Sequence, residues 1–419
     1  MYDVSRRPFR LSAEYHSLGM RSIRKAVLFV VAALLVLTGS GWLWVESVAR
    51  RRWAEMSRGI DELQKEADGL EVLRQPLRDP AEQGDAWKHY SSAVGGVHPL
   101  LLKGWRHGFL EGDAKADRKL IDADVTAMAA SLEELRRGAR CSEALRQPPP
   151  PEGKYSEWSP TIELAVLALC DARLKADAGR SAESLDRLLD TAQFARDVEA
   201  GRVNQGYTIF LSILGMVLEQ LREGLASSSP ETGDLRRLEH ALDVLDRTFP
   251  SEEAAAKGMI AANGTWLQEH DPYGVSTSLG GEIGRTMIRP GWRHAFSMRI
   301  FKADAFELWK SGLRLPESEM GDLVYGNRLA WNNAGSWIFG SSLESRAKLR
   351  LLRVAVAWRS GAPIPDLQDP FGGTLRVSQT TDALKVWSVG ADRKEDGGRG
   401  LWSRRPSASV PDIVLELKR

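Results

Sequence analysis

The sequence predicts a mainly α-helical protein with an N-terminal transmembrane helix and stalk, a helical-hairpin domain and a small C-terminal β module. Three observations predict this fold class: an uncharged apolar run near the N-terminus, helix-forming segments separated by Gly or Pro in the middle, and β-prone segments after residue 361. The chain therefore divides into a basic segment (1–25), a transmembrane helix (26–45), a helical stalk (46–80), a helical domain (81–360) and a β module (361–419).

Composition and charge exclude several classes of protein. The 419 residues are 43% hydrophobic and 27% charged, which is typical of a folded protein rather than a disordered one. The formal net charge of +1 provides no field that would attract nucleic acid, so we expect no nucleic-acid partner. Two cysteines are too few for a disulfide framework or a zinc ribbon.

The apolar run from Ala26 to Val45 predicts a membrane anchor. It contains no charged residue, and a helix of about 20 residues spans a bilayer core of about 30 Å. Trp42 and Trp44 lie at its C-terminal edge, where aromatic rings favour the membrane interface. A buried core helix or a cleaved signal peptide are the alternatives. The flanking basic clusters and the poor cleavage site favour an uncleaved helix whose partner is the lipid bilayer.

Flanking charges predict the orientation of this anchor. Basic residues accumulate on its N-terminal side, and the positive-inside rule places such a flank in the cytoplasm. We therefore expect a single-pass protein of the inner (cytoplasmic) membrane whose C-terminal domain is periplasmic or extracytoplasmic. The arginine pair in this segment also fits a twin-arginine export signal, although a second basic cluster separates it from the apolar run. The basic residues are Arg6, Arg7, Arg10, Arg21, Arg24 and Lys25.

Helical signals continue beyond the anchor. Helix-forming residues run from Val45 to Leu77, where Pro76 and Pro80 are expected to end the stalk. An amphipathic helix is expected near Leu120 to Arg137, before a run of four prolines. Further helices are predicted over 159–178, 182–199, 204–225, 231–247, 251–269, 294–311 and 343–360.

Two segments of the helical domain have additional features. The turn from Ala176 to Leu185 resembles the turn of a tetratricopeptide (TPR) repeat, which implies an antiparallel helix pair. The pattern does not recur one period later, so a repeat array does not follow. The aromatic and amide-rich stretch Tyr325 to Gly340 is either a ligand-binding surface or a buried aromatic cluster.

The C-terminal module contains short β-prone segments. Residues 374–377 and 383–388 flank a polar turn and predict a hairpin, and residues 413–417 predict a last strand.

This module also carries a family resemblance over about 55 residues. The motifs are DPFGG from Asp369, VWSVGAD from Val386, EDGG from Glu395, and Asp412 followed by isoleucine. In this order they resemble the C-terminal end of the major pseudopilins of type II secretion, and the same tail in uncharacterised bacterial proteins that have a membrane anchor and a helical domain. The pseudopilin leader pattern is missing here, and Arg393 stands where that family usually has Gly. The resemblance therefore implies a shared tail fold rather than a processed pilus subunit.

The resemblance also implies a calcium site. The pseudopilin loop binds Ca²⁺, and Ser388, Asp392, Asp396 and Asp412 are the matching candidates for its ligands. Calcium takes six to eight oxygen ligands, so loop carbonyls would complete the shell. The alternative is a solvated surface loop with ordinary turn residues.

Motifs for catalysis are missing from the sequence. It has no H-E-x-x-H, P-loop, G-x-S-x-G, dinucleotide fingerprint or C-x-x-C. Cys141 and Cys170 form either a disulfide or two buried thiols. We therefore expect a non-enzymatic, membrane-tethered envelope scaffold or adaptor with a protein partner, associated with a secretion or pilus-like assembly. The alternative is an envelope enzyme whose site is assembled from distant residues of the helical domain.

Overall fold

The computed structural model describes most of the helices and the C-terminal sheet. The described residues are 13–69, 74–97, 105–112, 117–144, 158–200, 206–227, 230–250, scattered positions between 254 and 265, residue 303, 334–390, 393–402 and 412–418. The chain forms two compact units, of which one is Met1–Gly59 with Leu267–Leu308 and the other is Ile60–Trp266 with Trp309–Arg419. The predicted helix 294–311, apart from residue 303, and residues 325–333 of the aromatic stretch Tyr325 to Gly340 lie outside the described residues.

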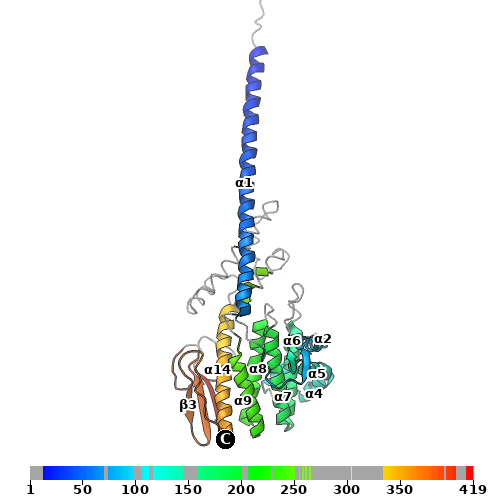
Figure 1. The fold of residues 1–419 in the computed structure, drawn as a ribbon, viewed down its shortest axis with the longest axis vertical. Helices are drawn as coiled ribbons and strands as arrows, with labels where there is room; N and C mark the ends of the chain where they lie inside the picture. The colour runs from blue at the N-terminus through cyan, green and yellow to red at the C-terminus, as the bar shows by residue number, and fades with distance from the viewer. Residues whose placement is uncertain are drawn as a thin grey trace, which may run out of the picture. The chain divides into compact units, whose positions relative to one another are not determined.

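The N-terminal helix α1 (Ala13–Gly69) is continuous (Figure 1). Its stretch Val27–Glu66 is long and apolar enough to cross a membrane, as predicted. The large side chains that the structure describes in its apolar part, between Val27 and Trp44, are exposed. The hydroxyl groups of Thr38 and Ser40 donate to carbonyl oxygens of the preceding turn, at 2.7 Å in each case, so these polar groups are satisfied within the helix.

The stalk ends earlier than the sequence predicts. Helix α1 ends at Gly69, and the described residues 74–81 are not helical. Pro76 disfavours a helical conformation at Gln75. Two arginines of this stretch also form ion pairs with helix α7 (Ser181–Ala200), which hold the chain in its non-helical path.

The helices of the larger unit pack in one continuous core. Helix α7 packs between α6 (Trp158–Asp177) and α8 (Gly206–Ser227), and α8 packs in turn on α14 (Ala334–Ser360). These bounds, and those of α9 (Thr232–Arg247), agree with the predicted helices within a few residues except at the start of α14. The predicted helix 120–137 is interrupted at Met128, which separates α4 (Arg118–Ala127) from α5 (Ala129–Ala139).

A short parallel strand pair was not predicted. Strands β1 (Glu82–Asp85) and β2 (Cys141–Glu143) pair with each other, and Glu82 lies directly opposite Cys141. These strands are too short to show the alternation of apolar residues that identifies a strand in a sequence. Helix α2 (Ala86–Gly95) follows β1 at once and packs against α5.

The small C-terminal β module is confirmed as an antiparallel sheet. Strands β3 (Arg376–Gln379), β4 (Ala383–Ser388) and β5 (Ile413–Lys418) lie in this order. The module packs on α14, which lies between the sheet and α9 (Figure 1). The inward side chains of the sheet are buried and belong to the same core as the helices; they are Leu384, Val386, Ile413, Leu415 and Leu417.

Candidate functional site

Two groups of polar residues are candidates for a functional site. The first lies in the C-terminal module, where a buried aspartate organises the turn before β3. The Asp369 carboxylate accepts hydrogen bonds from the backbone N–H of Phe371 at 3.0 Å and of Val389 at 2.9 Å. It also accepts one from the Ser388 hydroxyl at 2.8 Å. Asp369 therefore joins the DPFGG turn to the end of β4.

The loop before β5 is organised by a second buried aspartate. The Oδ2 atom of Asp412 accepts a hydrogen bond of 2.6 Å from the backbone N–H of Gly398. Its Oδ1 atom is buried and has no hydrogen-bond partner among the described residues. Burial raises the pKa of Asp412, although the backbone amides of Gly398 and Asp396 oppose this effect; the charges of Glu395 and Asp396 raise it further. Asp412 therefore has one oxygen atom available for a cation or a proton.

The four predicted calcium ligands lie in different environments. Asp396 and Asp412 lie close enough for their charges to interact. Ser388 is buried and donates its hydroxyl proton to Asp369. Asp392 lies outside the described residues. Asp369 was part of the motif but not of the predicted ligand set, and its oxygens accept hydrogen bonds from Phe371, Ser388 and Val389.

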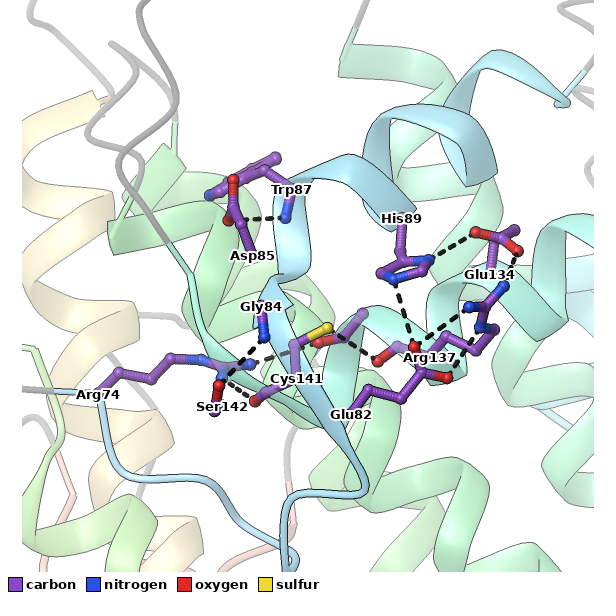
Figure 2. A network of polar contacts seen from close by, with 11 residues as sticks. Arg74, Glu82, Gly84, Asp85, Trp87, His89, Glu134, Arg137, Cys141 and Ser142 are labelled. Carbon is purple, nitrogen blue, oxygen red and sulfur yellow. Dashed lines mark hydrogen bonds and ion pairs between the residues drawn. The ribbon is translucent and has the colours of Figure 1, made fainter.

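The second group lies where β1, α2 and β2 meet. Ligand-type atoms of Glu82, His89 and Cys141 all lie within 4.8 Å of one another. The His89 Nε2 atom is 3.4 Å from Glu82 Oε2, and its Nδ1 atom is 2.7 Å from Glu134 Oε2. Figure 2 shows the imidazole ring between the two carboxylates. The histidine therefore has a carboxylate beside each of its ring nitrogens.

One arginine connects both carboxylates of this group. Arg137 donates to Glu82 from Nε at 2.8 Å and from Nη2 at 3.2 Å, and to Glu134 from Nη1 at 3.0 Å (Figure 2). Its hydrogen bond and charge lower the pKa of Glu82, and burial opposes them only in part. The pKa of Glu134 is lowered chiefly by its hydrogen bond with His89. Both carboxylates are therefore held in the ionised form.

The thiol of Cys141 is the buried member of the group. Its sulfur is 3.4 Å from the carbonyl oxygen of Arg137, and only 1% of the residue is exposed. Burial and the nearby Glu82 carboxylate raise the pKa of this thiol. Burial also raises the pKa of Cys170 in α6, to about 12. Both cysteines are free, which decides between the two alternatives that the sequence left open.

A buried ion-pair network supports the backbone of Cys141. Arg74 donates to the carbonyl oxygen of Cys141 and forms a two-pronged ion pair with Asp197 of α7 at 2.9 and 2.8 Å. Asp197 also accepts hydrogen bonds from the Tyr90 hydroxyl at 2.7 Å and from Gln193 Nε2 at 2.9 Å. The start of β2 is thereby attached to α2 and α7.

Sequence reasoning did not find the group of Glu82, His89 and Cys141. The low cysteine count argued against a zinc ribbon, and the strand pairing that brings residue 82 opposite residue 141 has no local signal. The spacing of seven residues between Glu82 and His89 is compatible with one site but far too common to indicate one by itself.

Comparisons with known proteins add no further assignment: no protein-family model, no curated protein and no solved structure has a significant match to this chain.

Proposed function

We propose that this protein is a non-enzymatic scaffold or adaptor of the cell envelope, tethered to the inner membrane by α1. The observation that carries this proposal is that the exposure of apolar side chains changes along one continuous helix. From Val27 to Trp44 its large apolar side chains are exposed, as in a helix whose solvent is lipid. Ala49, Met56, Ile60 and Leu63 further along are buried, as in a helix that packs on protein. The same helix thus contains an apolar span and a part that packs on protein.

The orientation that we propose follows from the charges beside the span. The basic N-terminal segment stays in the cytoplasm, and the domain after the span lies on the periplasmic or extracytoplasmic side.

The helical domain supports an adaptor role. Helices α6 and α7 pack against each other and are joined by a short turn at Gly179, and α8 packs on both. We propose that α6 and α7 are a TPR-like hairpin. Stacked helical hairpins provide long surfaces for protein partners. The open hollow at the end of α14 is lined by side chains that do not ionise, which suits binding better than acid–base chemistry; they belong to Trp358, Ala362, Pro363, Ile364, Gln379, Thr380 and Thr381.

The C-terminal module supports one kind of partner, a component of a secretion or pilus-like assembly. Its resemblance to pseudopilin tails favours association with a secretion or pilus-like assembly. We propose that its loop binds Ca²⁺, with Asp396 and Asp412 as ligands from the described residues and Asp392 and Ser388 as further candidates. The support for this site is the buried Oδ1 atom of Asp412, which has no hydrogen-bond partner among the described residues.

Membrane fractionation of the full chain tests the tether. We expect the wild-type protein to remain with membranes after alkaline carbonate washing. The variant L34R/L35R places two arginines in the span, each at a cost of about 2.5–3.5 kcal/mol, and should be released. The control L120R/L401R changes two leucines of similar exposure outside the span (51% and 77%, against 55% and 67%) and should stay bound.

Two results would contradict this proposal. Release of the wild-type chain by carbonate would remove the tether. If a reporter that is active only in the cytoplasm is active when fused to the C-terminus, the proposed orientation is wrong.

Proximity labelling in intact cells tests the adaptor role. The wild-type chain should label envelope assembly proteins, and this labelling should be lost with L34R/L35R and kept with L120R/L401R.

A second function is favoured by one observation. The group of Glu82, His89 and Cys141 combines two adjacent elements, β1 and α2, with β2 from much later in the chain, which is the arrangement expected of an envelope enzyme with an assembled site. Partial exposure of Glu82 and His89 gives that group access to solvent.

A further inference from the structure

We propose that Glu82, His89 and Cys141 bind a zinc ion, with a water molecule in the fourth coordination position. This inference concerns residues outside the predicted calcium loop, and it holds whether or not the protein acts as a scaffold. The ligands would be one carboxylate oxygen of Glu82, the Nε2 atom of His89 and the thiolate sulfur of Cys141.

Distances between the ligand atoms fit a tetrahedral zinc site. Zinc binds nitrogen and oxygen at about 2.0–2.2 Å and sulfur at about 2.3 Å, so two ligand atoms of a tetrahedron lie about 3.3–3.8 Å apart. The separation of His89 Nε2 and Glu82 Oε2 is 3.4 Å. Since all three ligand atoms lie within 4.8 Å of one another, shifts of about 1 Å or less complete the site.

Hydrogen bonds around the ligands match the outer layer of a metal site. A metal-binding histidine usually donates its second ring N–H to a carboxylate, which fixes the ring and the tautomer. Glu134 Oε2 lies 2.7 Å from Nδ1 of His89, so a proton on Nδ1 leaves the Nε2 lone pair directed at Glu82 and Cys141 (Figure 2). Arg137 occupies only part of the four lone-pair sites of the Glu82 carboxylate. The ion pairs and a metal ligand are thus compatible.

The backbone that carries the ligands is held in place before any metal binds. Pairing of β1 with β2 sets Glu82 opposite Cys141. Asp85 caps α2 by accepting a hydrogen bond from the N–H of Trp87 at 3.1 Å, which fixes His89 one turn into the helix. Arg74 binds the carbonyl oxygen of Cys141 from the other side (Figure 2). A preorganised set of ligands loses little entropy on binding a metal.

The ligand types select the metal. Calcium and magnesium take oxygen ligands and would leave the sulfur and nitrogen unused. One thiolate, one imidazole and one carboxylate suit zinc, and three protein ligands with an open fourth position are the pattern of zinc sites that bind water. Glu82 and His89 are 31% and 20% exposed, so the open position is accessible from their side of the group.

Titration of the full-length, metal-free protein in detergent with Co²⁺ and then Zn²⁺ tests this inference. We expect one Co²⁺ per chain, a thiolate-to-metal charge-transfer absorption, and visible bands of tetrahedral intensity that Zn²⁺ abolishes by displacement. The variant C141S should lose the charge-transfer band. The matched control C170S removes the other buried cysteine and should keep it, because Cys170 lies outside the group.

Further variants separate ligands from their supports. H89Q and E82Q should each lower zinc affinity at least 100-fold, whereas E134Q should keep one zinc per chain with an affinity lower by about 10–100-fold. Far-ultraviolet circular dichroism reports whether each variant is folded. The wild-type measurement needs no variant: a chain that binds Co²⁺ without thiolate absorption, or binds none, overturns the site. A charge-transfer band that survives C141S or disappears in C170S overturns the assignment equally.

Discussion

Arg74 and Asp197 form a two-pronged ion pair across 123 residues of chain, at 2.9 and 2.8 Å. It fastens the segment after α1 onto α7, together with Arg78, whose guanidinium is 2.8 Å from Asp190. The N–H of Leu77 and the carbonyl oxygen of Gln75 also bond to side chains of α7, at 3.0 and 2.8 Å. The first chain segment beyond the long helix is thus attached to the helical domain by polar contacts.

Asp197→Asn tests how much this attachment contributes. The Asp197 side chain is 2% exposed and that of Arg74 is 13% exposed, so the substitution leaves a largely buried guanidinium without its anion. We expect the free energy of unfolding to fall by about 3–5 kcal/mol. Urea unfolding of the full chain, followed by circular dichroism, measures this change.

The control for this prediction is Asp177→Asn. It removes the ion pair between Asp177 and Arg118, whose side chains are 35% and 57% exposed, respectively. The free energy of unfolding should fall by less than about 1 kcal/mol. Equal losses in the two variants would show that burial does not decide the contribution of the Arg74 pair.

Asp190 gives a pH prediction. Burial raises its pKa from 3.8 to about 6, although Arg78 opposes the shift. The folded state therefore holds this proton more tightly than the unfolded state. The stability from Asp190 is fully present below pH 4 and is lost as the pH rises through 6. Relative to the wild type, Asp190→Asn should become more stable by up to about 3 kcal/mol between pH 4 and 7.

Unfolding curves at several pH values measure that difference. Asp186→Asn is the control, because Asp186 shares the partner Arg78 but its side chain is 26% exposed. A gap between wild type and Asp190→Asn that stays constant from pH 4 to 7 would refute the prediction.

A matched pair of glycines tests the packing of α5 on α2. A Cβ atom at Gly138 would lie 2.5 Å from the ring of Tyr90 and 3.1 Å from the carbonyl oxygen of Ala86. Tyr90 is fully buried, so Gly138→Ala should destabilise the protein by about 1–3 kcal/mol. At Gly215 of α8 such an atom would meet nothing within 4 Å beyond the backbone of its own helix, and Gly215→Ala should stabilise the helix by about 0.5–1 kcal/mol. Thermal unfolding that gives both changes the same sign would contradict this account.

Calcium should stabilise the C-terminal module. Since a ligand that binds only the folded state adds about 2.7 kcal/mol at 100 times its Kd, excess Ca²⁺ should raise the Tm of the metal-free full chain. The variant D396N/D412N should lose this shift. The control D366N/D382N changes two exposed aspartates of the same module and should keep it. A Tm that Ca²⁺ leaves unchanged in the wild type, or raises equally with D396N/D412N, would remove the site.

Local signals determined much of the fold from the sequence alone. The apolar run 26–45, helices such as α7 and α9, and strands β4 and β5 follow from the composition and periodicity of neighbouring residues. The C-terminal motifs likewise directed attention to Asp412, whose burial and unpartnered Oδ1 only the structure revealed.

Tertiary structure alone decided where the polar groups meet. The non-helical path of residues 74–78 depends on carboxylates of α7 more than a hundred residues away. The group of Glu82, His89 and Cys141 depends on a strand pairing too short to leave a pattern in the sequence. Hydrophobic periodicity records which face of an element is buried, but it holds no information on which distant side chain that face will contact. The long apolar helix and the other helices were therefore readable from the sequence, and the candidate zinc site was not.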